Sequence, residues 1–346
     1  QGRYGDNMDV TLDARAIPLS LAALANPALN LSGTAAASAR ITGTPAAPAG
    51  RYEVTVSRFT SPEIARAGVG PYDMRATGTL EGGRAGVNAT ISGPALSGVA
   101  ITGSVPVSQG AMDLAARGTI SLAIANTLLS TSGARASGNA VLDVRLRGTY
   151  DAPSAGGTVR ISNGRYEDAP NGVTIERIEA LLTGTDRSVT LTSFRAATPN
   201  GGSIQAQGNV ALDPGAGFPG RIEATLTNAN LVNSEMIRFV TDGRVTVAGA
   251  FLTRPTISGQ INVRALDVNL PDRLPGGSAA NINVRHVNLP PGVTPAMPRP
   301  RGGRAVGSAG GFILGLDLTV AAPNRIFVRG MGMEAEMGGT LQIQSG

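Results

Sequence analysis

The sequence contains no cysteine, no tryptophan and no lysine, and aromatic residues make up only 3% of its 346 residues. The lack of cysteine excludes a disulfide framework, thiol catalysis and cysteine-ligated metal centres. Apolar residues still amount to 42% of the chain, and they are mainly alanine, valine, leucine and isoleucine. Side chains of this size form thin apolar layers rather than a bulky core, and the scarcity of aromatics argues against the aromatic girdles of a membrane barrel.

Long hydrophobic runs are also missing. No stretch of about 18 apolar residues occurs, so the sequence predicts no membrane-spanning helix. The chain opens at Gln1 without a methionine and stops at Gly346 directly after a predicted strand. We therefore expect it to be a piece of a longer protein.

Positive charge is carried entirely by arginine. The 29 basic residues exceed the 24 acidic ones, which gives a net charge of +5. The arginines are spread singly along the chain, and their one local cluster is Arg299, Arg301 and Arg304. A nucleic-acid-binding surface gathers basic residues on one face. Dispersed arginines are instead typical of the solvated face of strands, so we expect no nucleic-acid partner.

The dominant pattern is an alternation of apolar and polar residues with a period of two. For example, Leu142, Val144 and Leu146 alternate with Asp143 and Arg145. Because successive residues of a strand point to opposite faces, each such segment has one apolar and one polar face. The pattern predicts an all-β, elongated, curled and antiparallel-rich sheet that is apolar on one side. The residues expected to line this side are Val87, Ala89, Ile91, Leu142, Val144, Leu146, Ile204, Val210, Leu212, Ile222, Leu226, Ile257, Ile261, Val263, Leu314, Leu316, Leu318 and Val320.

The 47 glycines and 22 prolines predict many turns between the strands. Asparagine–glycine, aspartate–glycine and double-glycine sequences, which tight turns favour, occur at residues 81–84, 163–164, 171–172, 200–202 and 242–243. Short helical turns are predicted at residues 19–24 and 233–239. Residues 290–311 are rich in proline, glycine and arginine and predict a mobile loop.

A weak internal repeat runs through the chain. Similar strand–turn–strand segments follow Gly43, Gly148 and Gly249, about a hundred residues apart. A period of this length predicts units of several hairpins stacked along one axis. We expect three units, at residues 1–130, 131–239 and 240–346.

A sheet with one apolar face must cover that face. A packed sandwich needs larger side chains than this sequence has, so we expect a trough, or β-taco, lined by small aliphatic residues. Roughly 25 strands of about 7 residues would give a trough on the order of 120 Å long. An empty trough exceeds the apolar patch that a soluble protein tolerates, so an apolar ligand should occupy it. An alternative is an inert structural or adhesive β-solenoid with a packed interior.

Catalytic chemistry is not evident. His286 is the only histidine, so the sequence indicates neither a histidine metal site nor a Ser–His–Asp triad. Glu334 and Glu336 are two residues apart on a predicted strand, so they share its solvated face. We therefore expect no enzyme, no metal and no cofactor, and bound phospholipid is the one ligand we expect.

The last third of the chain resembles the TamB family, within the AsmA-like superfamily. The likeness covers residues 240–346. It is carried by the strand sequence at residues 326–330, by an acidic pair and by a double glycine. These motif residues are Ile326, Phe327, Val328, Arg329, Gly330, Glu334, Glu336, Gly338 and Gly339. Family members often have arginine–glycine–leucine after the phrase, where this chain has Met331, Gly332 and Met333.

The resemblance implies a periplasmic protein that is tethered to the inner membrane by an N-terminal anchor absent from this sequence. It implies a folded β-sheet trough with an apolar interior and a TamA- or BamA-type barrel partner at the outer membrane. Two roles are implied: phospholipid transport between the membranes, and assistance to outer-membrane protein assembly or translocation. The second role would use exposed sheet edges to pair with a client strand.

Overall fold

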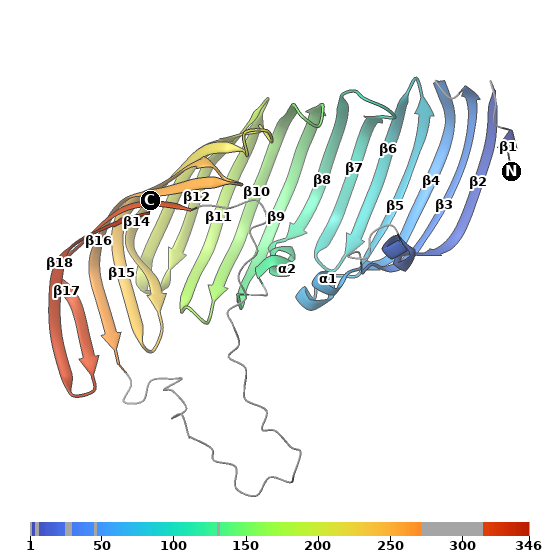
Figure 1. Ribbon diagram of the computed structural model, residues 1–346. Coiled ribbons are helices and arrows are strands. Elements are labelled where there is room, and N and C mark those ends of the chain that lie inside the picture. Colours follow the sequence, from blue (N-terminus) through green and yellow to red (C-terminus); the bar gives the residue numbers. More distant parts are fainter. Residues whose placement is uncertain are drawn as a thin grey trace, which may run out of the picture.

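The computed structural model describes residues 2–3, 7–24, 30–44, 47–129, 132–270 and 314–345. These residues form one sheet of 18 strands, which confirms the expected all-β, elongated and curled fold (Figure 1). The first nine strands are β1 (Gly2–Arg3), β2 (Met8–Pro18), β3 (Ser32–Thr44), β4 (Ala47–Thr60), β5 (Tyr72–Glu81), β6 (Arg84–Gly93), β7 (Leu96–Pro106), β8 (Met112–Ser121) and β9 (Ala134–Gly148). The other nine are β10 (Pro153–Asp168), β11 (Val173–Thr185), β12 (Ser188–Thr198), β13 (Gly202–Ala211), β14 (Pro219–Asn233), β15 (Ile237–Ala250), β16 (Arg254–Asn269), β17 (Gly315–Gly330) and β18 (Met333–Gln344).

Each strand pairs with the strand that follows it in the chain. The pairs are antiparallel, except that β16 and β17 run parallel on either side of residues 271–313. The predicted mobile loop at 290–311, the arginine cluster 299–304 and His286 lie outside the described residues. Hairpin connections keep most partners close in sequence, so local alternation can set the register of the sheet.

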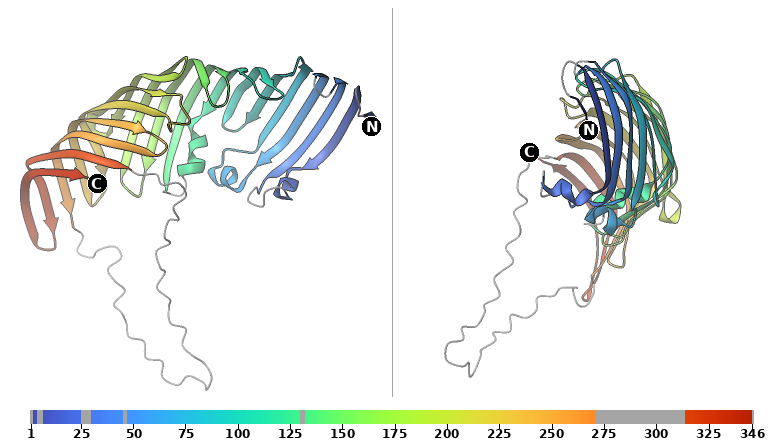
Figure 2. Two further views of the ribbon diagram at one scale, coloured as in Figure 1. Left: turned by 45° about the horizontal axis from the view of Figure 1, so that its top comes forward. Right: turned by 90° about the vertical axis from the view of Figure 1, so that its right-hand side faces the viewer.

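The sheet is bowed across its strands, so it has a concave and a convex face (Figure 2). Apart from the two-residue β1, the strands are 10 to 16 residues long. The expectation of roughly 25 strands of 7 residues was therefore wrong. At about 4.8 Å per strand, the described sheet extends about 80 Å rather than 120 Å.

Bulges explain part of this difference: one lies at Asn163 in β10, and another lies at Asn228 in β14, opposite Asp242 of β15. The predicted turns at 163–164 and 242–243 lie within β10 and β15 instead, whereas the other three predicted turns join strands. Asn163 has φ of 51° at a register shift, and its N–H donates to Glu179 Oε1 at 3.1 Å. Asn228, with φ of 47°, donates in the same way to Asp242 Oδ1 at 2.6 Å. A bulge and a tight turn need the same backbone conformation, so the local sequence does not distinguish them.

Short helices lie at one rim of the concave side (Figure 2). They are η1 (Leu19–Leu24), α1 (Pro62–Ala67), η2 (Leu122–Ala125) and α2 (Asn126–Leu129); η3 (Pro199–Gly201) is a turn between β12 and β13. Near α1, the buried residues Val69, Tyr72 and Ala95 form a small core against which Ile64 of α1 packs. The helix predicted at 19–24 is confirmed.

The helical turn predicted at residues 233–239 is wrong, because this segment joins β14 to β15. Ser234 and Ile237 close the connection: the N–H of Ser234 donates to the carbonyl of Ile237 at 2.9 Å, and the Ser234 hydroxyl accepts the N–H of Ile237 at 3.0 Å. The strand partners on both sides therefore outweigh the local helical preference.

The three repeat segments fall at equivalent places in the sheet. Gly43, Gly148 and Gly249 stand at the connections β3–β4, β9–β10 and β15–β16, six strands apart. The sheet is continuous throughout, and the expected boundary between residues 239 and 240 lies inside β15. The division into three units stays a prediction.

Candidate functional site: the concave apolar face

The strand register assigns every strand residue to one of the two faces. One row of concave residues crosses fifteen consecutive strands, from β2 to β16, without a polar side chain. We call it the floor row, and it consists of Ala14, Ala37, Val54, Ala76, Ala89, Ile101, Ala116, Val144, Gly157, Gly184, Val189, Val210, Gly220, Gly249 and Pro255. Direct cross-strand neighbours on one face are about 5 Å apart, so the floor row is a continuous apolar strip.

A parallel row beside it carries the larger aliphatic residues of the second half of the sheet. It runs through Leu142, Val159, Leu182, Leu191, Gly208, Ile222, Val247, Ile257 and Leu316. Sixteen of the eighteen residues that the sequence predicts for the lining lie in strands and on this concave face. Leu212 and Leu314 lie just outside β13 and β17. That these residues contact lipid stays a prediction.

The described residues place no second layer over this face. Among the residues whose side chains the structure describes, no leucine, isoleucine, phenylalanine or methionine is buried. The buried hydrophobic residues are mostly alanines, and Leu12 and Leu146 on the concave face are 51% and 37% exposed. Side chains of the concave face are therefore available to a ligand.

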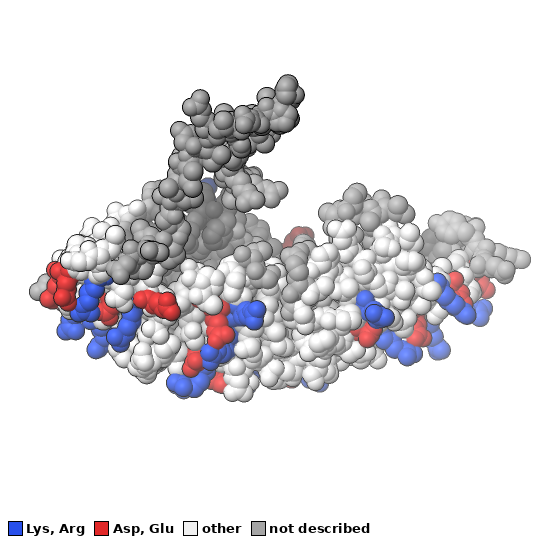
Figure 3. All heavy atoms as spheres, turned by 90° about the horizontal axis from the view of Figure 1, so that it is seen from below, with Lys and Arg blue, Asp and Glu red and all other residues white. Residues whose placement is uncertain are grey.

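The convex face has the opposite character. Arginine side chains and acidic side chains gather along it, on the lower side of Figure 3. Cross-strand ion pairs connect neighbouring strands, such as Arg145 with Asp113 at 2.6 Å and Arg117 with Asp143 at 3.0 Å. The hydrogen bond from the Arg145 guanidinium lowers the pKa of the Asp113 carboxyl. This face is consequently well solvated and gives the sheet its polar exterior.

The motif residues of the last two strands are mainly structural. Glu334 lies on the convex face, as expected, and its carboxylate pairs with Arg329 Nε at 3.0 Å. The Arg329 guanidinium carbon lies 5.5 Å from the centre of the Phe327 ring. Gly330 has φ of 126°, and a Cβ there would lie 2.0 Å from the carbonyl oxygen of Leu270. Gly330 is thus required because the backbone of Leu270 passes too close to leave room for a side chain.

The remaining motif residues fit the same sheet. Glu336 is paired in register with Phe327, Ile326 with Met337, Val328 with Ala335, and Gly339 with Ala322; Gly338 lies opposite the register shift between β17 and β18. None of these residues forms a cluster that suggests catalysis.

Several concave residues were missed by sequence reasoning. The floor row includes Ala37, Ala76 and Ala116, which are small and sit in segments with many glycines and alanines. Their signal was alternation of alanine with polar residues, as at Ala37, Ser38 and Ala39. Reasoning that selects large aliphatic residues overlooks such strands, although small residues are what keeps the trough open.

Other kinds of site are not found in the described part of the chain. It holds no group of three or more histidine, cysteine, aspartate or glutamate side chains placed to bind a metal ion. It also has no helix of the length and apolar character that crossing a membrane requires.

Comparison with known proteins identifies one related family. Residues 192–345, from the middle of β12 to the end of β18, match the model of the TamB C-terminal domain. No curated protein and no solved structure matches the chain. The matched residues and the strands before them belong to the same continuous sheet.

Proposed function

On the premise that the chain is TamB-like, with a TamB C-terminal domain at residues 192–345, we propose that it carries phospholipid along its concave face. The acyl chains lie on the floor row and its neighbours, and the polar headgroups stay at the open side of the trough. This segment is part of a bridge between the inner and outer membranes.

The floor row is the observation that carries the proposal. Burial of each methylene group of an acyl chain contributes about 0.8 kcal/mol. Over fifteen strands with only Ala, Val, Ile, Gly and Pro in this row, neighbouring positions offer an acyl chain similar apolar surroundings. A lipid that moves by one strand exchanges one set of aliphatic contacts for another, so binding is favourable while barriers between positions stay low. Transport along such a surface is passive.

The family assignment supports a location and partners as part of this proposal. The full protein is periplasmic, is anchored in the inner membrane by a segment before Gln1, and meets a TamA- or BamA-type barrel at the outer membrane.

Charges placed on the concave face test the proposal. Ile261→Arg places a guanidinium on the concave face, and Asn262→Arg places it on the convex face, beside Asp242. Lipid transfer between donor and acceptor vesicles should be lost with the first variant and kept with the second. Leu316→Asp and Thr319→Asp form a second pair of this kind on β17. Equal lipid transfer by floor and convex variants would rule out the proposal.

A second candidate is assembly or translocation of outer-membrane proteins with the barrel partner. That function uses strand edges rather than the floor. Photo-crosslinking from position 261 on the concave face and position 342 on the convex face of β18 separates the two: lipid adducts from position 261 favour transport, and unfolded client adducts from β18 favour assembly. The third candidate, an inert solenoid, requires a packed interior, and the described sheet has a single layer.

A further inference from the structure

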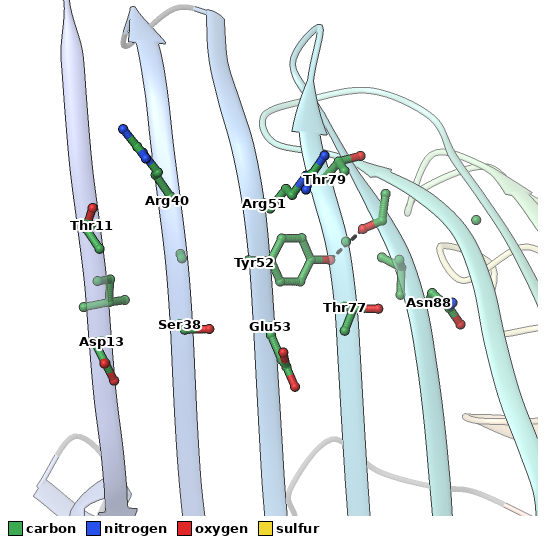
Figure 4. Close-up of a pocket in the computed structure, with 16 residues that line it drawn as sticks. Thr11, Asp13, Ser38, Arg40, Arg51, Tyr52, Glu53, Thr77, Thr79 and Asn88 are labelled. Atoms are coloured by element: carbon green, nitrogen blue, oxygen red, sulfur yellow. Dashed lines mark hydrogen bonds between the residues drawn. The ribbon is translucent and has the colours of Figure 1, made fainter.

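One aromatic side chain on the concave face has an unusual position. Tyr52 of β4 lies in the row next to the floor row, and it pairs in register with Ala39 and Gly78. Its ring lies across Gly78, because a Cβ on that glycine would be 2.7 Å from two ring carbons. The phenol hydroxyl donates to the carbonyl oxygen of Gly86, two strands away, at 2.7 Å (Figure 4). The ring thus lies flat on the sheet instead of standing in the trough.

The sheet is interrupted beneath this ring. Register pairs between β5 and β6 are formed on both sides, at Thr77 with Asn88 and at Leu80 with Ala85, but the two positions between them are unpaired. A Cβ on Gly78 would lie only 1.8 Å from the Gly86 carbonyl oxygen, so this carbonyl is turned toward the concave face. An unpaired carbonyl in an apolar floor costs free energy unless a donor reaches it. Tyr52 supplies that donor.

The opposite side of the same gap is also hollowed. A shallow pocket of about 770 Å³ lies across β2 to β6, and its lining includes Gly78, Gly86 and Tyr52 (Figure 4). Its walls are convex-face side chains, such as Arg51 in one row and Thr77 in the next. Neither Gly78 nor Gly86 has a side chain to fill the gap. The Tyr52 ring is the side chain that covers this gap from the concave side.

Tyr72 makes a similar contact in a different setting, which helps to interpret Tyr52. A Cβ on Gly93 would meet the Tyr72 ring at 2.4 Å, so this ring also covers a glycine. Tyr72 is 8% exposed in the small core beside α1, and its hydroxyl has no hydrogen-bond partner among the described residues. Tyr72 is thus a packing residue of the rim. Tyr52 is only partly buried on the open face, and its hydroxyl is bound to the backbone.

We infer that Tyr52 seals a gap in the β5–β6 ladder and so keeps the apolar concave surface continuous from β4 to β6. It is a positioning residue for the acyl chain, and this part of the inference rests on the proposed function. Loss of the ring exposes the Gly86 carbonyl to the floor and connects the trough with the convex pocket.

The seal itself is tested without lipid, by hydrogen exchange of the whole chain. Tyr52→Ala should accelerate exchange of the amides of residues 78–79 and 86–87 by about tenfold, and Tyr52→Phe should do so less, because the ring remains. Leu80→Ala, which removes a neighbouring concave side chain without a hydrogen bond, should leave these amides unchanged. Wild-type exchange at residues 86–87 in Tyr52→Ala, or equal acceleration by Leu80→Ala, would overturn the seal.

The separation of the two faces is tested with a fluorescent label. The chain has no cysteine, so Thr77→Cys allows a single label on the wall of the convex pocket. Phosphatidylcholine with brominated acyl chains should quench this label strongly with Tyr52→Ala, weakly with Tyr52→Phe and hardly at all with wild-type Tyr52. Equal quenching in the three proteins would overturn the role of Tyr52 in positioning lipid. If the wild-type protein binds no brominated lipid, the proposed function fails. The hydrogen-exchange experiment then still tests whether Tyr52 seals the gap.

Discussion

The two faces of the sheet are built by the same strands and differ only in which alternate residues they contain. The floor row on the concave face has no polar side chain in fifteen strands. The convex row that runs through Asp13, Ser38, Glu53, Thr77, Asn88, Thr102, Ala115 and Arg145 has one apolar residue in eight. A single-layer sheet can thus offer a long apolar surface and stay solvated, because the strand pairing keeps the apolar residues of neighbouring strands on the same face.

The largest expected effect comes from two adjacent glycines of β10. Gly157 belongs to the floor row, has φ of 95°, and a Cβ there would lie 2.1 Å from the carbonyl oxygen of Asp143. Gly156 points to the convex face and has open space around it. Gly157→Ala should lower the free energy of unfolding by about 3 kcal/mol, because positive φ and a backbone clash add. Gly156→Ala should change it by less than about 1 kcal/mol. Urea denaturation followed by circular dichroism measures both, and equal effects would contradict the assigned faces.

A matched pair of alanines on β8 tests lipid binding on the two faces. Ala116 lies in the floor row, whereas Ala115 lies on the convex face opposite Arg145. Ala116→Asp should reduce the phospholipid that copurifies with the protein by about tenfold, because a charge on the floor removes apolar contact on both of its sides. Ala115→Asp should leave the phospholipid content unchanged. Mass spectrometry of extracted lipid gives the comparison, and a loss in both variants would show that the faces do not differ in lipid binding.

A smaller effect concerns acid stability at a bulge. The N–H of Asn228, followed by the Arg264 guanidinium, lowers the pKa of the Asp242 carboxyl. A lowered pKa in the folded state means that this carboxylate stabilises the fold above its unfolded pKa of about 3.9, and that the contribution is lost as the pH falls through the folded value. Asp242→Asn should therefore lower the melting temperature at pH 7. Below pH 4 the melting temperatures of the wild-type protein and the variant should become more similar. A constant difference from pH 7 to pH 3 would contradict this account.

The smallest effect is expected from the ion pairs of the convex face. Asp113 pairs with Arg145 at 2.6 Å and with Arg147 at 3.5 Å, and these side chains are 39% to 56% exposed. Asp113→Asn should lower the melting temperature slightly at low salt and not measurably at high salt, because exposed pairs are screened. Copurified phospholipid should stay at the wild-type amount. A marked loss of lipid in this variant would mean that the convex face takes part in binding.

Much of the fold could be predicted from local alternation. The apolar residues of β6, β9 and β16 alternate regularly, and the structure places them on one face. The strand count could not be predicted, because the turn-like sequences at Asn163 and Asp242 lie within strands, the first at a bulge and the second opposite one. Apart from Ala89, the lining was predicted only where it uses valine, leucine or isoleucine, and Tyr52 was missed. Its role depends on Gly78 and Gly86, which β-pairing brings beneath its ring.

The sequence by itself determined that the chain forms strands with one apolar side, because the period of two is a property of neighbouring residues. It also determined that the apolar side is thin, because alanine, valine and glycine have little volume. Only the tertiary structure decided which residues form each row, and how the rows join from strand to strand. Those features depend on register, bulges and curvature, which arise from contacts between residues far apart in the chain.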